Sequence, residues 1–218
     1  MVTVSDHSYD ICIKGICQSP GCGTAVCNAP GPHFTLPDTN QRLCYNDSQS
    51  IPCPSEGEEF YGQDAQYGWD VSNTSEERFG RDTSAIDQPI VIDNVTGLVW
   101  QGCTAGLFGD TCASGSVITL NWAAALAYCD SLSWGDYTDW RLPDRYELES
   151  IVDAGRVNPA IEMTAFPATL SSSFWSSSSG AYHGTVAWGV NFNNGDVVSY
   201  GKDGKGDSTY ARCVRGGP

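Results

Sequence analysis

The fold is decided by the stretch NWAAALAYCDSLSWGDYTDWRLPDRYELESIVDAG (residues 121–155), which predicts two helices. At its start, Asn121 can cap the first helix because its side-chain oxygen can accept a backbone N–H of the first turn. Trp122, Leu126 and Cys129 follow at the spacing i, i+4 and i+7, which forms one apolar face. The first predicted helix therefore places Cys129 on its buried side.

The second helix is marked by Pro143 and Asp144, with Glu147 three residues after the aspartate in the spacing of a capping box. Gly155 is expected to end it. The apolar stripe of this helix consists of Leu148, Ile151 and Val152. Both helices are thus predicted from start signals and periodicity together.

Short β-branched or aromatic runs flank these helices and predict strands. The expected strands cover residues 90–92, 97–100, 188–192, 197–200 and 209–215. Asp93-Asn94 indicates a turn between the first two, and Asn194-Gly195 predicts a two-residue type I′ hairpin turn. Two helices combined with these hairpins indicate an α+β domain.

Ten cysteines and three histidines, with no Cys-x-x-Cys spacing, favour disulfides and an oxidising compartment over a zinc or redox site. Three pairs are predicted: Cys129 with Cys213, Cys103 with Cys112, and Cys44 with Cys53. The connectivity of the other four stays open, with an iron–sulfur or zinc site as the alternative. These four are Cys12, Cys17, Cys22 and Cys27.

Composition and charge divide the 218-residue chain, whose net charge is −15. Residues 1–35 form a Cys-rich segment, residues 36–87 an irregular leader with a disulfide, and residues 88–218 the globular domain. The acidity argues against a nucleic-acid or anionic-membrane partner.

No apolar stretch reaches the roughly 18 residues that a membrane span needs. No signal-peptide pattern is visible, so we expect a mature product or an excised piece.

Several motifs resemble, in the same order, the family of Legionella-collagen-like (Lcl) C-terminal domains. The motifs are DNVTGLVWQ (93–101), WAAALAYC (122–129), DWRLPD (139–144), NPAI (158–161), FWSS (174–177) and RCVRGG (212–217). The segments LPDT (36–39) and FYGQDAQY (60–67) also look like a leader that often precedes this domain in bacterial surface proteins.

The resemblance implies a C-type-lectin-like domain with two helices and a twisted antiparallel sheet, preceded here by an irregular, disulfide-rich extension. It also implies a secreted or surface-displayed bacterial module that binds ligands. The founding member is an adhesin for sulfated polysaccharides. This chain has no collagen Gly-X-Y repeat, and its acidity would repel a polyanion over most of its surface.

The ligand is predicted to bind between residues 176 and 210, where aromatic, amide and charged side chains interleave. This segment overlaps the positive stretch 199–218, which has four basic and two acidic residues. The alternative is ordinary hairpin loops with Trp175 and Trp188 in the core, and for these two tryptophans we favour it. The predicted ligand-binding residues are Tyr182, His183, Asn191, Asn193, Asn194, Asp196, Tyr200, Lys202, Asp203, Lys205, Asp207 and Tyr210.

Neither a cofactor nor catalysis is expected. Residues 191–196 and 203–207 offer oxygen ligands, so calcium is an alternative, but the Glu-Pro-Asn and Gln-Pro-Asp tripeptides of calcium-dependent lectins are absent. Residues 141–148 also resemble formylglycine-generating enzymes of the same broad fold. However, the four cysteines of the domain have structural assignments, and His183 has no acid or nucleophile partner at a diagnostic spacing.

Three functional hypotheses follow. The first is a non-catalytic, adhesin-like module, extracellular or on the cell surface, that binds a glycan or protein ligand on a cell or matrix surface. The second is a structural subunit of a surface filament or fibre that self-assembles through its N-terminal cysteines. The third is a variable protein whose residues 176–210 are diversified by a retroelement to bind protein ligands.

Overall fold

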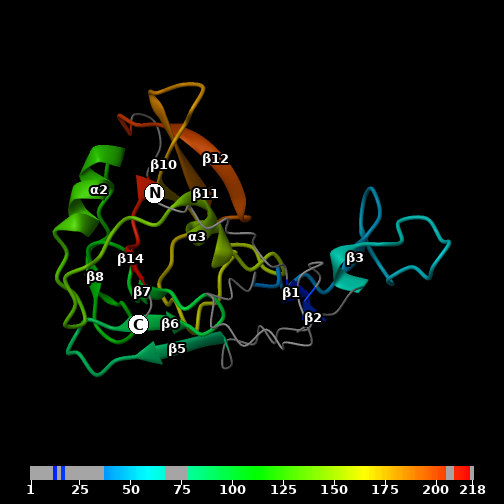
Figure 1. Cartoon of the computed structure of the whole chain (residues 1–218), viewed down its shortest axis with the longest axis horizontal. Coiled ribbons are helices and arrows are strands. Elements are labelled where there is room, and N and C mark those ends of the chain that lie inside the picture. The colour runs from blue at the N-terminus through cyan, green and yellow to red at the C-terminus, as the bar shows by residue number, and fades with distance from the viewer. Residues whose placement is uncertain (1–11, 14–15, 18–36, 67–77, 205–208, 217–218) are drawn as a thin grey trace, which may run out of the picture. The chain divides into compact units, whose positions relative to one another are not determined.

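The computed structural model describes residues 12–13, 16–17, 37–66, 78–204 and 209–216 (Figure 1). The chain divides into two compact units, Met1–Phe34 and Thr35–Pro218. In the first unit, β1 (Cys12–Ile13) and β2 (Ile16–Cys17) pair as antiparallel strands. For this segment, the sequence predicts either disulfides or an iron–sulfur or zinc site. Both predictions depend on the side chains of Cys12, Cys17, Cys22 and Cys27, which lie outside the described part of the structure.

Two four-stranded sheets form the framework of the second unit. One has the order β14 (Val214–Arg215), β7 (Val99–Gln101), β6 (Ile90–Asp93) and β5 (Phe79–Asp82). The other has the order β12 (Asp196–Gly201), β11 (Val186–Asn191), β10 (Ser173–Ser179) and β13 (Thr209–Tyr210). All neighbours are antiparallel except β10 and β13. The α+β class is confirmed, but the expected antiparallel sheet is two sheets, one of them mixed.

β5 extends the first sheet into residues that composition assigned to the irregular leader. It pairs along its whole length with β6. Immediately before it, Arg78 is 1% exposed and forms an ion pair with Asp93, with 2.8 Å between Nη2 and Oδ2. The first sheet therefore uses chain from both sides of the predicted boundary at residue 88.

The segment 209–215, predicted as one strand, is two strands in different sheets. β13 pairs with β10, and β14 pairs with β7. Between them, the carbonyls of Ala211 and Cys213 accept hydrogen bonds of 2.9 Å from the N–H groups of Ala105 and Gln101. Each half of the segment pairs with a strand that is remote in the sequence, so local alternation could not reveal the division.

The turn between β11 and β12 has four residues rather than the two predicted from Asn194-Gly195. Asn191 and Asp196 are the opposite partners that close it. Gly195 has a φ of +87° and donates its N–H to the carbonyl of Asn191 at 2.8 Å. Phe192 is 1% exposed and packs into the core. Burial of Phe192 draws this residue out of the strand and lengthens the loop.

The first predicted helix is α2 (Trp122–Asp130), seen at the left of Figure 1. Asn121 caps it as expected, and its carboxamide oxygen accepts the Ala124 N–H at 2.8 Å. Its buried residues are Ala125 and Cys129, whereas Leu126 is half-buried. Neither this helix nor any other in the described ranges has the length and hydrophobicity of a membrane span.

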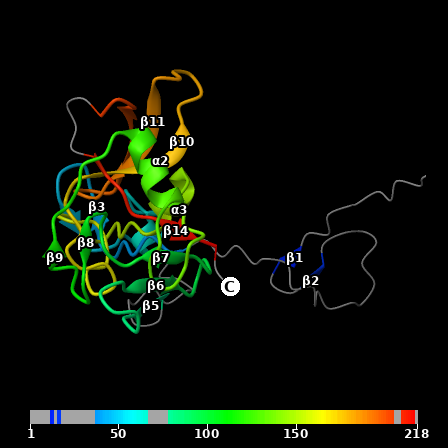
Figure 2. The same ribbon diagram turned by 90° about the vertical axis from the view of Figure 1, so that its left-hand side faces the viewer.

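The second predicted helix is α3 (Arg145–Ser150), which lies behind α2 in the view of Figure 2 and is separated from it in Figure 1. Asp144 and Glu147 form the predicted capping box. Glu147 also pairs with Arg141 through two contacts of 2.6 Å. The helix ends at Ser150, short of the glycine stop expected at Gly155. Its start is thus correctly predicted and its end is not.

Replacing Glu147 with glutamine is expected to cost about 0.5–1 kcal/mol of stability at neutral pH, because the half-exposed Arg141 loses its ion-pair partner while the cap is kept. Burial alone would raise the pKa of Glu147, but hydrogen bonds from Arg141 and the Asp144 N–H, together with the charge of Arg141, lower it. The ion pair thus stabilises the fold above the ordinary pKa of 4.5 and is lost as the pH falls through the lowered value. Urea unfolding at pH 7 and pH 3 should show the difference between the two proteins shrinking with acidification.

All three predicted disulfides of the second unit are present. They are Cys44–Cys53, Cys103–Cys112 and Cys129–Cys213. The last joins α2 to the segment between β13 and β14, and the buried side chains of Trp134, Trp140 and Trp175 belong to the same cluster. A second cluster, on the α3 side, contains Trp100, Phe174 and Leu148.

The leader forms a small hairpin of its own. Strands β3 (Cys44–Tyr45) and β4 (Ser50–Ile51) pair across a turn, and η1 (Asp64–Gln66) follows. The Gln63 side chain accepts the N–H of Tyr45 at 2.8 Å and donates to its carbonyl at 2.9 Å. Elsewhere, β8 (Leu107–Phe108) and β9 (Ser114–Gly115) form a hairpin over the Cys103–Cys112 loop.

Candidate functional site

The predicted ligand-binding residues lie at two opposite ends of the β11–β12 hairpin. The strands pair from Val186 and Gly201 at one end to Asn191 and Asp196 at the other. The first end, which we call the near end, holds Tyr182, His183, Lys202 and Asp203. The far end holds Asn191, Asn193, Asn194 and Asp196. Lys205 and Asp207 lie outside the described residues.

The polar side chains of the far end bond mainly to one another. The Asn191 carboxamide oxygen accepts the N–H of Asn193 at 2.9 Å. The Asn194 side-chain amide donates to the Asp196 carboxylate at 2.7 Å. These bonds stabilise the four-residue loop, as turn-forming residues commonly do. We therefore assign the far end to turn structure.

Two predicted tyrosines pack against the core. The Tyr200 ring meets Trp175 edge to face at 5.9 Å, and its hydroxyl oxygen accepts the Ser173 hydroxyl at 2.7 Å. The Tyr210 ring lies 5.8 Å from Phe174. Both tyrosines are half-buried. Their rings therefore stabilise the second sheet and offer little surface to a ligand.

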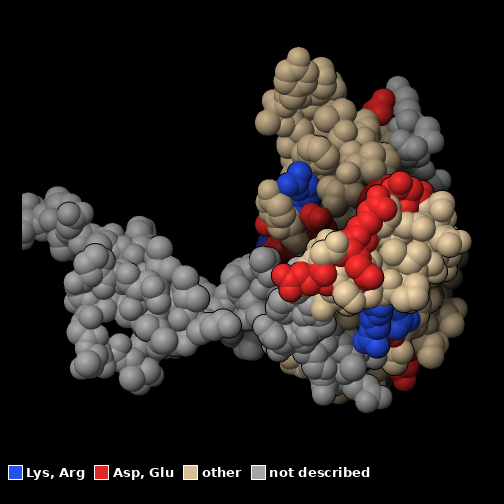
Figure 3. All heavy atoms as spheres, turned by 90° about the vertical axis from the view of Figure 1, so that its right-hand side faces the viewer, with Lys and Arg blue, Asp and Glu red and all other residues tan. Residues whose placement is uncertain are grey.

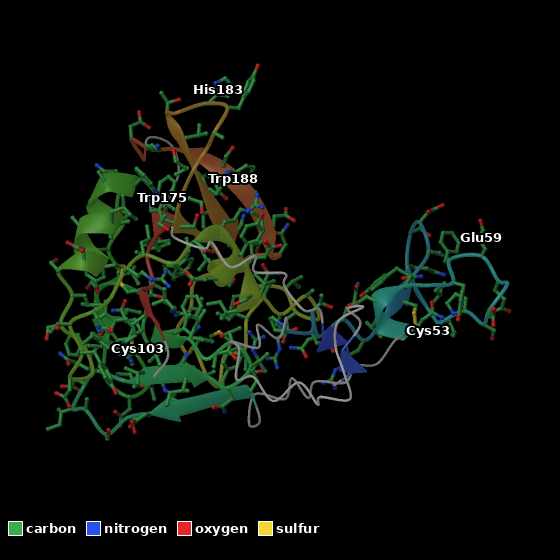
Figure 4. All side chains as sticks on the ribbon, viewed as in Figure 1. Cys53, Glu59, Cys103, Trp175, His183 and Trp188 are labelled. Carbon is green, nitrogen blue, oxygen red and sulfur yellow. A yellow bond between two sulfur atoms is a disulfide. The ribbon has the colours of Figure 1, made fainter. Side chains whose placement is uncertain are left out.

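The near end carries a lysine held over an aromatic ring. Lys202 Nζ lies 4.2 Å from the centre of the Trp122 ring and 2.6 Å from Ser179 Oγ. Tyr182 is 91% exposed, and its ring contacts His183 edge to face at 4.6 Å. Figure 4 shows His183 at the tip of the loop between β10 and β11. We call Lys202, Trp122 and Ser179 the Lys202 group.

A second group at this end was missed in the sequence. The guanidinium of Arg145 lies 4.4 Å from the ring centre of Tyr146 and 5.1 Å from that of Trp188. Tyr146 is 69% exposed, and Arg145 has no acidic partner among the described residues. We call Arg145, Tyr146 and Trp188 the Arg145 group. Trp188 is only half-buried, so its predicted core position is wrong, whereas Trp175 is fully buried (Figure 4).

The two groups flank the end of β10 on opposite sides of the sheet. Ser178 Oγ accepts the N–H of Arg145 at 3.0 Å, and the next residue, Ser179, bonds to Lys202. On β11, Ala187 belongs to the cluster on the α2 side, against which Trp122 packs, whereas the next residue, Trp188, points to the opposite face of the sheet. The two groups are therefore separated by the sheet. A signal for the Arg145 group was present in the sequence: Arg145 and Tyr146 lie outside the apolar stripe of α3 and are free to face solvent.

Negative charge gathers on the leader rather than at these groups. Residues 44–66 contain no basic residue. Their acidic side chains are all exposed and are Asp47, Glu56, Glu58, Glu59 and Asp64. Figure 3 shows a band of acidic side chains on the face of the molecule that includes this loop. Across the described residues, no three His, Cys, Asp or Glu side chains are arranged to hold a metal ion.

The model of the Lcl C-terminal domain family matches residues 89–215. The matched region begins just before β6 and ends in β14, so it contains both helices, both groups at the near end and all strands of the two sheets except β5. It leaves out the leader. No curated protein matches the chain.

Proposed function

Because the chain belongs to the family of Lcl C-terminal domains, we propose that it is an extracellular, non-catalytic ligand-binding module of a bacterial surface, with C-type-lectin-like architecture. The observation that carries this proposal is the Arg145 group, an arginine that lies between two aromatic rings and lacks an acidic partner among the described residues. Three disulfides support an oxidising, extracellular setting.

The composition of the Arg145 group suits recognition of a ligand. Arginine, tyrosine and tryptophan are the residues that dominate binding energy at interfaces. The Tyr146 ring can stack on a sugar ring or a side chain, and the guanidinium has donors left for hydroxyl or carbonyl oxygens. We propose a glycan on a cell or matrix surface as the ligand, in keeping with an adhesin-like role.

Catalysis has little support in the same region. Each of the six cysteines whose side chains are described is in a disulfide. His183 is exposed, and its closest aromatic contact is Tyr182. A nucleophile and a base within hydrogen-bond reach of each other, which covalent catalysis requires, do not occur around it in the described part of the chain.

Replacing Arg145 with alanine is expected to weaken glycan binding at least about tenfold, because the donors and the cation between the two rings are lost together. A glycan array, with and without calcium, identifies the glycan, and calorimetric titration measures the change. Asn193→Ala at the far end is the matched control and should bind like the original protein. Loss of affinity in the Asn193 variant alone would place the site at the far end and refute this assignment.

The filament and retroelement hypotheses stay predictions. The first depends on Cys12, Cys17, Cys22 and Cys27, whose side chains lie outside the described residues. The second concerns the coding sequence, where a template repeat would have to be found. A blank glycan array would make a protein ligand the better proposal for the Arg145 group.

A further inference from the structure

A groove of about 400 Å³ lies between the leader and the loop that follows α3, both within the second unit. Asn40, Arg42 and Tyr45 contribute to the leader wall. Asp153, Arg156 and Glu162 contribute to the opposite wall. Its volume lies within the range of about 300–1,000 Å³ that is typical of small-ligand sites. The groove shares no residue with the Arg145 or Lys202 group.

Backbone contacts hold the two walls together. The N–H of Ala154 donates to the carbonyl of Thr39 at 2.8 Å. A Cβ placed on Gly155 would lie 2.5 Å from the carbonyl oxygen of Asn40, so only glycine allows this close approach. Within the leader, the Thr39 hydroxyl bonds to Asp64. The contacts of Ala154 and Gly155 therefore fix the leader against the domain beside the groove.

One arginine of the groove is oriented by two carboxylates. Arg156 Nε lies 2.7 Å from Asp153 Oδ2, and its Nη2 bonds to Glu162. Asp153 is 7% exposed and also accepts the N–H of Gly155 at 2.9 Å. A guanidinium held in this way keeps its remaining donors in fixed directions, which reduces the entropy lost on binding.

The other arginine, Arg42, is exposed and has no hydrogen-bond or ion-pair partner among the described residues. Beside it, Leu43 is 56% and Tyr45 43% exposed. The side of the groove that faces solvent thus has free donors next to an apolar side chain and an aromatic ring. This site could not be predicted from the sequence, because the residues that line its two walls form no motif.

We propose that this groove binds a neutral saccharide. Two arginines balance Asp153 and Glu162, so the charged lining has no net charge and favours neither an anion nor a cation. Guanidinium donors, carboxylate acceptors and the Asn40 amide match the paired donors and acceptors of sugar hydroxyls. The Tyr45 ring can stack on a sugar face. A purely apolar ligand would leave these polar groups desolvated without partners, which is costly.

This site is separate from the proposed glycan surface at the near end, and it needs the leader as well as the domain.

The test uses the full chain with a panel of neutral sugars: glucose, galactose, mannose, N-acetylglucosamine, lactose, maltose, cellobiose and chitobiose. Saturation-transfer NMR at millimolar concentration identifies the sugars that bind. Amide resonances of Gly155 and Arg156 are expected to shift when the bound sugar occupies the groove.

Arg42→Ala is expected to weaken the binding of that sugar at least about tenfold without affecting the fold, because Arg42 is exposed and has no partner in the described structure. Asn193→Ala, in the turn at the far end, is the matched control and should leave this binding unchanged. The proposal is overturned if no sugar of the panel binds, if Arg42→Ala binds normally, or if glucuronic acid or glucosamine binds better than its neutral counterpart. If only Arg145→Ala loses affinity for the sugar, the proposal that the groove binds it is overturned, and the near end is supported as its binding site.

Discussion

Replacing Asp93 with asparagine is expected to destabilise the protein by about 3–5 kcal/mol, a large part of the stability of an ordinary domain. The side chains of Arg78 and Asp93 are 1% and 0% exposed, and they form two contacts of 3.2 and 2.8 Å. Asp93 Oδ1 also accepts the N–H groups of Val95 and Thr96 at 3.0 and 3.3 Å. Neutralising this carboxylate leaves a buried guanidinium whose remaining acceptor among the described residues is the Ser150 carbonyl.

Urea unfolding at neutral pH measures this loss, with Asp139→Asn as the matched control. Asp139 also pairs with an arginine, Arg215, at 2.7 Å, but its side chain is 59% exposed, so solvent screens the pair and we expect a much smaller change. Replacing both partners, Arg78→Met with Asp93→Leu, should recover part of the stability because no buried charge remains, although the N–H groups of Val95 and Thr96 lose their acceptor. A loss below about 1 kcal/mol in Asp93→Asn would contradict the buried, paired state.

The features that could be predicted from the sequence are those fixed by neighbours along the chain. Asn121 and Asp144 cap their helices as expected, since a cap involves residues only three positions apart. The pair Cys44–Cys53 was predicted from a short turn between its cysteines. In the same way, the strands β6 and β7 were predicted from apolar runs on either side of a turn.

The features that could not be predicted depend on pairing across the fold. Arg78 lies in a segment with no strand signal of its own, and its partner Asp93 is 15 residues away. β14 and β13 are adjacent in sequence yet join different sheets. The length of the loop between β11 and β12 also could not be predicted from its own residues. Asn194-Gly195 favours a two-residue turn, but burying the Phe192 side chain stabilises the fold more than that turn would.

In the candidate site too, features set by neighbouring residues could be predicted, whereas contacts between distant segments could not. Residue type selected Lys202 and Tyr182, which lie at the near end, together with Asn193 and its neighbours, which lie a full strand length away. Arg145 and Tyr146 were interpreted only as the start of a helix, because nothing in their own segment shows that Trp188 packs beside them. The groove at Arg42 needs two segments more than a hundred residues apart.

Removing the Cys129–Cys213 disulfide by the double change to alanine is expected to cost on the order of 4–5 kcal/mol. The bond joins positions 84 residues apart, and in the chain-entropy model the stabilisation rises with the length of the loop that is closed. Both cysteines are fully buried in the α2 cluster, so the lost sulfur contacts add to the entropic loss. Thermal and urea unfolding of the double variant measure the total.

The Cys103–Cys112 pair supplies a matched control, because its cysteines are equally buried but only nine residues apart. The same model assigns it roughly 2–3 kcal/mol, so the double alanine variant of this pair should lose about 2 kcal/mol less. Since loss of sulfur packing is similar in the two variants, the difference between them isolates the loop-closure contribution. Equal losses would show that local packing dominates, and the long-range disulfide would then not be what closes the domain.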